Sequence, residues 1–238
     1  MHANGAVFTV DLTMDEVRRL SKEKSNDFEQ ELKGAAKTLC SALKEFNCNQ
    51  RPGSITANSA VSVPRDFDPR FSCKWKRYIY YISCGHQNRR SPFIARFAWQ
   101  IDQCLDYESM SSAVRLLNGT HNFQWLSVVE EGELRSPIRT LGLKLERMEG
   151  SIFQKDGTTM LKVSGQCDFF LYNMMRRIVG ALVSIGKKQT TLSALESCLK
   201  SHDEDRQPAS KAAIPPSLLT TSPANGLCLD HVEYGIEV

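Results

Sequence analysis

The segment from Asp168 to Gly186 constrains the fold of this 238-residue chain more than any other segment. Its apolar residues recur at nearly helical spacing, at Phe170, Met174, Ile178, Leu182 and Ile185. A recurrence of this period predicts a long helix with one face buried. The segment is therefore expected to form a helix that belongs to the core of the protein.

Two arginines, Arg176 and Arg177, lie in the middle of this apolar segment. A buried guanidinium without an anion is costly, so their surroundings matter. In one interpretation both lie on a solvated or paired face, which is the commoner outcome for helix arginines. In the other, at least one points into a cleft and holds a carboxylate or an RNA phosphate. Spacing alone favours the first interpretation.

Composition indicates a globular protein of one large domain or two small, closely packed ones. The chain is 41% hydrophobic and 24% charged, with a formal net charge of +3. That net charge is compatible with nucleic-acid binding but does not by itself indicate it. No apolar run has the length of a membrane span, and the first residues lack the pattern of a signal peptide. We therefore expect no membrane partner.

The eight cysteines are scattered, without a C-x-x-C pair and without Cys/His pairs at zinc spacing. They are Cys40, Cys48, Cys73, Cys84, Cys104, Cys167, Cys198 and Cys228. Scattered thiols are typical of a reducing compartment, so an intracellular location is expected, in the cytoplasm, the nucleus or an organelle. We predict neither a metal site nor a disulfide framework.

The remaining periodicities predict alternating helices and strands. Helices are expected over 13–24, 26–46, 107–117 and 190–200, and strands over 5–12, 59–63, 73–83, 141–148, 160–165 and 226–233, with loops at 48–58 and 201–222. Thr13 and Glu16 have the spacing of a capping box at the start of the first helix. This order favours a mixed α/β or α+β sheet with helices on one side.

The predicted strand from Cys73 to Ser83 is both basic and aromatic. Tyr78 and Tyr80 should share one face of the strand, because side chains alternate between faces. Basic residues interleaved with rings suit a site for a flipped base, where charge meets phosphate and rings stack on the base. The alternative is an ordinary strand with aromatic core residues on both faces, and the strand by itself favours that alternative.

Several sequence blocks, in order along the chain, resemble the TruA family of tRNA pseudouridine synthases. They are His2-Ala3, Arg70-Phe71-Ser72 with Arg77-Tyr78-Ile79-Tyr80, Asn118-Gly119 with His121 and Phe123, Arg135 to Thr140, Phe170 to Gly180, and Gly226 to Tyr234. The block at 170–180 is the strongest, since it has the family's Phe followed by N/H-M-x-R-x-I-V-G. Together the blocks span nearly the whole chain.

The resemblance implies an α+β fold with a mixed, largely antiparallel sheet in two similar halves, flanking helices and a positively charged cleft. Residues 1–85 would be the remainder of the N-terminal half, which is incomplete, and residues 86–238 the C-terminal half. The implied activity is isomerisation of uridine to pseudouridine in tRNA, in the anticodon stem-loop, without a cofactor. A homodimer is the family's common assembly, although the sequence carries no interface signature of its own.

The resemblance also implies roles for individual residues. Tyr78 would stack on the flipped uracil and take part in proton removal. Arg176 would pair with the nucleophilic Asp and keep it ionised. Lys76, Arg77 and Arg177 are candidate RNA contacts. Tyr80 and Arg177 are candidates either for RNA contact or for supporting the residues that touch the substrate.

The family's nucleophile is the Asp of R-T-D-x-G-V-H, which would stand three positions before Met1. Without this carboxylate the family's mechanism is not expected to operate, and neither Asp11 nor Asp168 is expected to replace it. We expect residues 1–238 to be inactive alone and the activity to reside in a longer form. A truncated gene model, a shortened isoform and an internal start all remain open, as do a catalytically inactive RNA-binding protein and an unstable fragment.

Overall fold

In the computed structural model the chain forms two compact units. One consists of Met1–Ala6 and Cys73–Tyr234, and the other of Val7–Ser72 and Gly235–Val238. The structure describes residues 2–3, 10, 12–21, 28–49, 59–85, 91–126, 136–149, 158–203 and 214–235. The expected division into two similar halves, residues 1–85 and 86–238, stays a prediction, because it concerns the similarity of the halves to each other and not their compactness.

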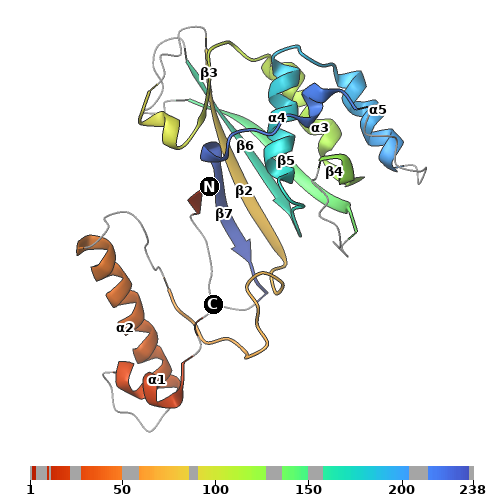
Figure 1. The fold of residues 1–238 in the computed structure, drawn as a ribbon. Coiled ribbons are helices and arrows are strands. Elements are labelled where there is room, and N and C mark those ends of the chain that lie inside the picture. Colours follow the sequence, from red (N-terminus) through yellow and green to blue (C-terminus); the bar gives the residue numbers. More distant parts are fainter. Residues whose placement is uncertain are drawn as a thin grey trace. The chain divides into compact units, whose positions relative to one another are not determined.

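The larger unit is built on a mixed sheet of seven strands, drawn in Figure 1. The strands are β1 (His2–Ala3), β2 (Trp75–Cys84), β3 (Trp99–Ile101), β4 (Gly119–Asn122), β5 (Ile138–Met148), β6 (Thr159–Cys167) and β7 (Leu227–Glu233). Their order is β1-β7-β2-β6-β5-β4, and β3 pairs with β2. Among the strands that the structure describes, only the β1–β7 and β2–β3 pairs are parallel. The predicted class, α+β with a largely antiparallel sheet, is confirmed.

Strand β2 lies at the centre of this sheet, between β6 and β7. Tyr80 is fully buried in the main core, and the half-buried Tyr78 packs against the same core. Tyr81 packs instead on a small second cluster formed by Ile94, Ala98 and Met160. The predicted sharing of one face by Tyr78 and Tyr80 is therefore confirmed, as is the strand itself.

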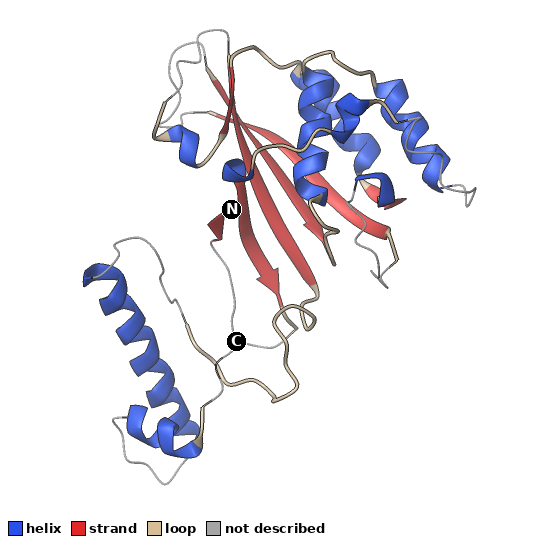
Figure 2. Ribbon diagram, in the orientation of Figure 1, coloured by secondary structure: helices blue, strands red, loops and turns tan. Residues whose placement is uncertain are grey.

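Three helices cover one face of the sheet (Figure 2). They are α3 (Tyr107–Leu117), α4 (Met174–Gly186) and α5 (Leu192–Asp203). Short 3-10 helices lie at Ile94–Arg96, Gln124–Leu126, Pro216–Leu219 and Ala224–Gly226. In α4 the predicted apolar positions from Met174 onward are buried almost completely. This helix brings the most apolar segment of the chain onto the tyrosine-bearing face of the sheet.

Helix α4 begins later than the sequence predicts. Residues 168–173 form a turn, and Asn173 adopts a left-handed conformation with φ 57° and ψ 6°. A left-handed residue cannot continue a right-handed helix, and Asn is among the few residue types that adopt this conformation readily. The prediction that Asp168 starts the helix was therefore wrong.

The smaller unit contains two helices, α1 (Met14–Leu20) and α2 (Phe28–Asn49). The predicted capping box is present: Thr13 Oγ1 accepts from the Glu16 amide, and Glu16 Oε2 accepts from the Thr13 amide at 2.8 Å. The strand predicted over 59–63 was wrong, because those residues are in neither a strand nor a helix. Of the strand predicted over 5–12, only Val10 and Leu12 are described, and neither is in a strand.

Several other predicted features fall on residues whose structure is not described. These are most of the loop predicted at 48–58, Arg135 and most of the loop after residue 203, whereas residues 48 and 49 belong to helix α2. Within the described residues, no helix is both long and apolar enough to cross a membrane.

Candidate active site

Tyr78 lies in the middle of the sheet on the face covered by helices. Its Cα pairs with Gly165 of β6 on one side and with Leu229 of β7 on the other. The ring meets Phe170 edge to face, with the two centroids 5.0 Å apart and the planes at 89°. Burial raises the pKa of the Tyr78 phenol, so the group is protonated at neutral pH. Tyr78 therefore offers a fixed ring and a neutral hydroxyl.

Arg176 lies in the first turn of α4, and its guanidinium is held from two directions. The Nε donates to the carbonyl oxygen of Ser222 at 2.8 Å, and Nη1 donates to Oδ1 of Asn173 at 3.1 Å. The Arg176 carbonyl in turn accepts from the Ser222 amide at 3.1 Å. Both acceptors of the guanidinium are neutral. Among the described residues no carboxylate pairs with Arg176, so its charge is oriented but not neutralised there.

A continuous set of contacts connects the surroundings of these two residues. Phe170, which meets Tyr78, lies in the turn that leads into α4. Tyr80, two positions along β2 from Tyr78, donates its hydroxyl proton to the Pro223 carbonyl at 2.6 Å. Pro223 directly follows Ser222, the partner of Arg176. The structure thus brings the predicted Tyr78 and Arg176 to one side of the sheet.

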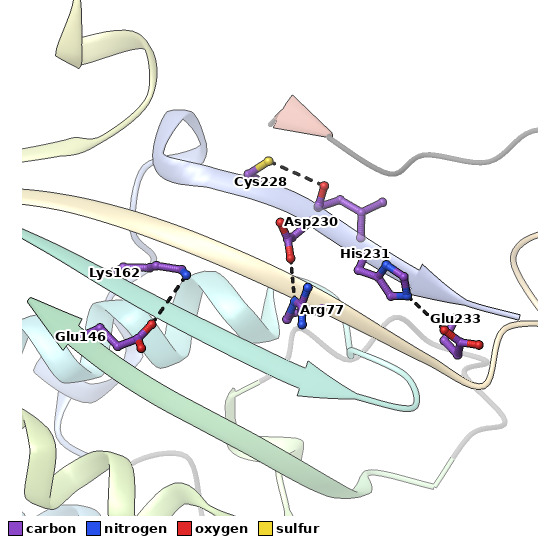
Figure 3. A network of polar contacts seen from close by, with 8 residues as sticks. Arg77, Glu146, Lys162, Cys228, Asp230, His231 and Glu233 are labelled. Atoms are coloured by element: carbon purple, nitrogen blue, oxygen red, sulfur yellow. Dashed lines mark hydrogen bonds and ion pairs between the residues drawn. The ribbon is translucent and has the colours of Figure 1, made fainter. Parts of the chain in front are cut away.

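The other predicted RNA contacts have different surroundings. Arg77 lies on the opposite face of β2 from Tyr78 and forms an ion pair with Asp230, with Nε and Oδ2 2.6 Å apart (Figure 3). Lys76 is half-buried and alternates with Arg77 along the strand. Arg177 is partly buried in α4, and burial lowers the pKa of its guanidinium. Alternation along β2 places Lys76 on the same face as Tyr78, and all three RNA contacts stay predictions.

Sequence reasoning missed the groups that hold Arg176. One of the two is a backbone carbonyl, that of Ser222, and the segment around it was interpreted as the end of a loop; the neighbouring Pro223 carbonyl accepts from Tyr80. Every residue has a carbonyl, so no side-chain pattern marks these two. Asn173 was visible within the Phe170–Gly180 block, and an Asn just before a helix is a signal for a left-handed turn.

The described residues contain no group of three His, Cys, Asp or Glu side chains that could hold a metal ion. The seven described cysteines are free thiols.

Comparison with known proteins identifies similar sequences. A family model described as tRNA pseudouridine synthase matches residues 113–235. The chain is 34% identical over 185 residues to tRNA pseudouridine synthase A of Moorella thermoacetica, covering 77% of this chain and 65% of that protein. The protein of the same name from Shouchella clausii is 31% identical over 208 residues, covering 87% of this chain and 70% of the relative. That from Erythrobacter litoralis is 30% identical over 191 residues, with coverages of 79% and 68%. The chain thus spans about two thirds of the length of these relatives.

Proposed function

Because the chain belongs to the TruA family of tRNA pseudouridine synthases, we propose that the protein isomerises uridine to pseudouridine in tRNA, in the anticodon stem-loop. In this reaction the N1–C1′ bond of uridine breaks and a C5–C1′ bond forms. The C5 proton is lost and N1 gains one, so the overall change is an isomerisation. We also propose the family's homodimer, which sedimentation at micromolar concentration would test.

The observation that carries this proposal is the state of Arg176. Its guanidinium is half-buried, is oriented by Ser222 and Asn173, and has no anionic partner among the described residues. A cation that has lost part of its hydration and is held in one orientation favours an anion beside it. The family's reaction needs an ionised Asp at this position, and Arg176 would lower the pKa of that Asp.

The pairing of β1 supports a source for that carboxylate. β1 runs parallel to β7, with His2 opposite Cys228 and Ala3 opposite Leu229. In R-T-D-x-G-V-H the Asp stands four positions before the His. Strand β7 begins at Leu227, directly after the 3-10 helix Ala224–Gly226. Because β1 runs parallel to β7, sequence preceding His2 extends from the end of β7 that follows Ser222 and Pro223. We therefore propose that the nucleophile is supplied by sequence preceding His2, close to Arg176.

Tyr78 completes the proposed site from the sheet side. Its ring is fixed by Phe170 and by its place in the central strand. A fixed aromatic ring is a suitable surface for an extruded uracil, because every base offers a π-face for stacking.

The decisive experiment compares two forms of the protein on tRNA that carries tritium at uridine C5. A form extended through R-T-D-x-G should release tritium, and residues 1–238 alone should not. In the extended form, Arg176→Lys should lower the rate by about a hundredfold, because the forked donor pattern is lost. Arg115→Lys, an exposed residue of α3, is the matched control and should have no effect.

Different outcomes would favour the alternatives. Salt-dependent tRNA binding without turnover by the extended form would indicate an RNA-binding protein that keeps Tyr78 and Arg176 without catalysis. Release of tritium by residues 1–238 would contradict the proposed upstream nucleophile. A thermal melt without a cooperative transition would indicate an unstable fragment.

A further inference from the structure

The segment from Thr220 to Gly226, here called the strap, lies tightly between α4 and β2. At one end, a Cβ on Gly180 of α4 would overlap the carbonyl oxygen of Thr220. At the other end, a Cβ on Gly226 would lie 2.6 Å from Cε1 of the Tyr80 ring. The absence of a side chain at both glycines is what permits this close approach.

Hydrogen bonds fix the strap to both neighbours. On the α4 side, Ser222 both donates to and accepts from Arg176, at 3.1 and 2.8 Å. On the β2 side, the Tyr80 hydroxyl donates to the Pro223 carbonyl at 2.6 Å. Tyr80 and Ser222 are each 0% exposed, so neither side chain is placed to contact RNA directly.

We propose that Tyr80 is a positioning residue for Arg176, acting through the strap. The Tyr80 phenol donates a hydrogen bond to the Pro223 carbonyl and thereby fixes the orientation of the neighbouring Ser222 carbonyl. That carbonyl accepts the hydrogen bond from Nε of Arg176. This inference rests on the proposed function, because it assumes that the direction of the Arg176 guanidinium matters for catalysis.

The protonation state of Tyr80 is consistent with this role. Burial raises the pKa of its phenol to about 12. The hydroxyl is therefore a hydrogen-bond donor throughout the neutral range, and it is not suited to act as a general base there. Its contribution to the rate should not vary with pH between 6 and about 9.

The first test measures the position of the guanidinium without any turnover. In residues 1–238 labelled with 15N, the Nε–H of Arg176 should give a resonance protected from exchange, assigned by its loss in Arg176→Lys. Tyr80→Phe deletes only the hydroxyl and keeps the ring that packs on Gly226. We expect this variant to shift the resonance and speed its exchange, whereas Tyr81→Phe, on the other face of β2, should change neither.

The second test measures turnover in the extended form. Tyr80→Phe should lower kcat by about tenfold with little change in KM for tRNA, as expected for one lost hydrogen bond that orients a catalytic group. Tyr81→Phe should match the parent protein. In an Arg176→Ala background, Tyr80→Phe should cause no further loss, because the group it positions is gone.

Each outcome has a distinct meaning. If the losses from Tyr80→Phe and Arg176→Ala multiply, Tyr80 acts by general structural support and the inference is overturned. An unchanged Arg176 resonance in Tyr80→Phe overturns it as well. If the parent extended form has no activity while the resonance shifts as expected, the proposed function fails and the structural connection stands.

Discussion

Arg176 and Arg177 are neighbours in α4 and yet have different surroundings. Successive helix residues point about 100° apart, so one can face the strap while the other does not. Arg176 binds Ser222 and Asn173, whereas Arg177 loses hydration in a partly buried position, and this loss lowers its pKa. At the scale of the residue, the binding of a carboxylate or an RNA phosphate by either arginine stays a prediction.

Gly180 gives the first residue-level prediction. In Gly180→Ala the new methyl group meets a backbone carbonyl, that of Thr220, which cannot rotate away. We expect a loss of about 1–3 kcal/mol in the free energy of unfolding, because overpacking forces backbone shifts. Urea denaturation followed by circular dichroism would measure this loss.

Gly142→Ala is the matched control for that experiment. Gly142 lies in β5, is exposed, and a Cβ there would find its nearest atom, the Gln166 carbonyl oxygen, at 3.9 Å. This substitution should leave the stability nearly unchanged. Equal losses in the two variants would mean that the strap does not pack on α4 as closely as described.

At the scale of the element, α3 begins at a defined cap. Asp106 accepts from the Ser109 amide through Oδ1 at 3.1 Å, and Nζ of Lys188 lies 3.7 Å from its Oδ2. The Asp106 amide also donates to the Gly186 carbonyl at 2.9 Å, which joins the start of α3 to the end of α4. The cap therefore stabilises the contact between two helices that cover the sheet.

The pKa of Asp106 makes this cap sensitive to acid. Its hydrogen bond with the Ser109 amide is the main cause that lowers the pKa below 3.8. A carboxyl group with a lowered folded-state pKa stabilises the fold above its unfolded-state pKa, and this contribution is lost as the pH falls through the folded-state pKa. Asp106→Asn should therefore lower the melting temperature near neutral pH, and the difference from the parent should shrink below pH 3.8.

Melting curves between neutral and acidic pH would test this expectation. Asp106→Ala is the comparison, since it removes the capping oxygen as well as the charge and should lower the melting temperature at every pH. A difference between parent and Asp106→Asn that does not depend on pH would contradict the role of the carboxylate.

At the scale of the whole molecule, burial should separate the reactivity of Cys104 from that of the buried thiols, with Cys40 and Cys73 of intermediate exposure. Cys104 is exposed, whereas Cys84, Cys167, Cys198 and Cys228 are buried. Burial raises the pKa of the Cys84 thiol to about 11 and that of the Cys167 thiol to about 12. The thiolate is the reactive form, so these two groups should be inert in the folded protein.

Alkylation followed by peptide mass spectrometry would measure this separation. Cys104 should be labelled rapidly in the native protein, and the four buried thiols only after denaturation. Cys104→Ser is the control, since it should remove the rapid labelling of the peptide that carries residue 104. Labelling of Cys167 as fast as that of Cys104 would contradict the packing at the end of β6.

Local patterns in the sequence determined much of this molecule. The periodicity predicted α3 at its observed bounds and the capping box predicted the start of α1, because such features depend on neighbours within a few residues, whereas α1 ends at Leu20 and not at the predicted residue 24. Alternation on β2 correctly assigned Tyr78 and Tyr80 to one face. The start of α4 and the absence of a strand at 59–63 were not predicted, because they depend on a left-handed residue and on the lack of a partner strand.

Only the tertiary structure decided what holds Arg176. Its partner Ser222 is 46 residues away in the chain, and Pro223 is 143 residues from Tyr80. The acceptors at Ser222 and Pro223 are backbone carbonyls, which are the same in every residue and acquire a role only when folding brings them to a donor. The sequence by itself therefore determined the family and the class of the fold, and the roles of Tyr78 and Arg176 stay predictions. The direction of the guanidinium depends on long-range backbone contacts that no local pattern encodes.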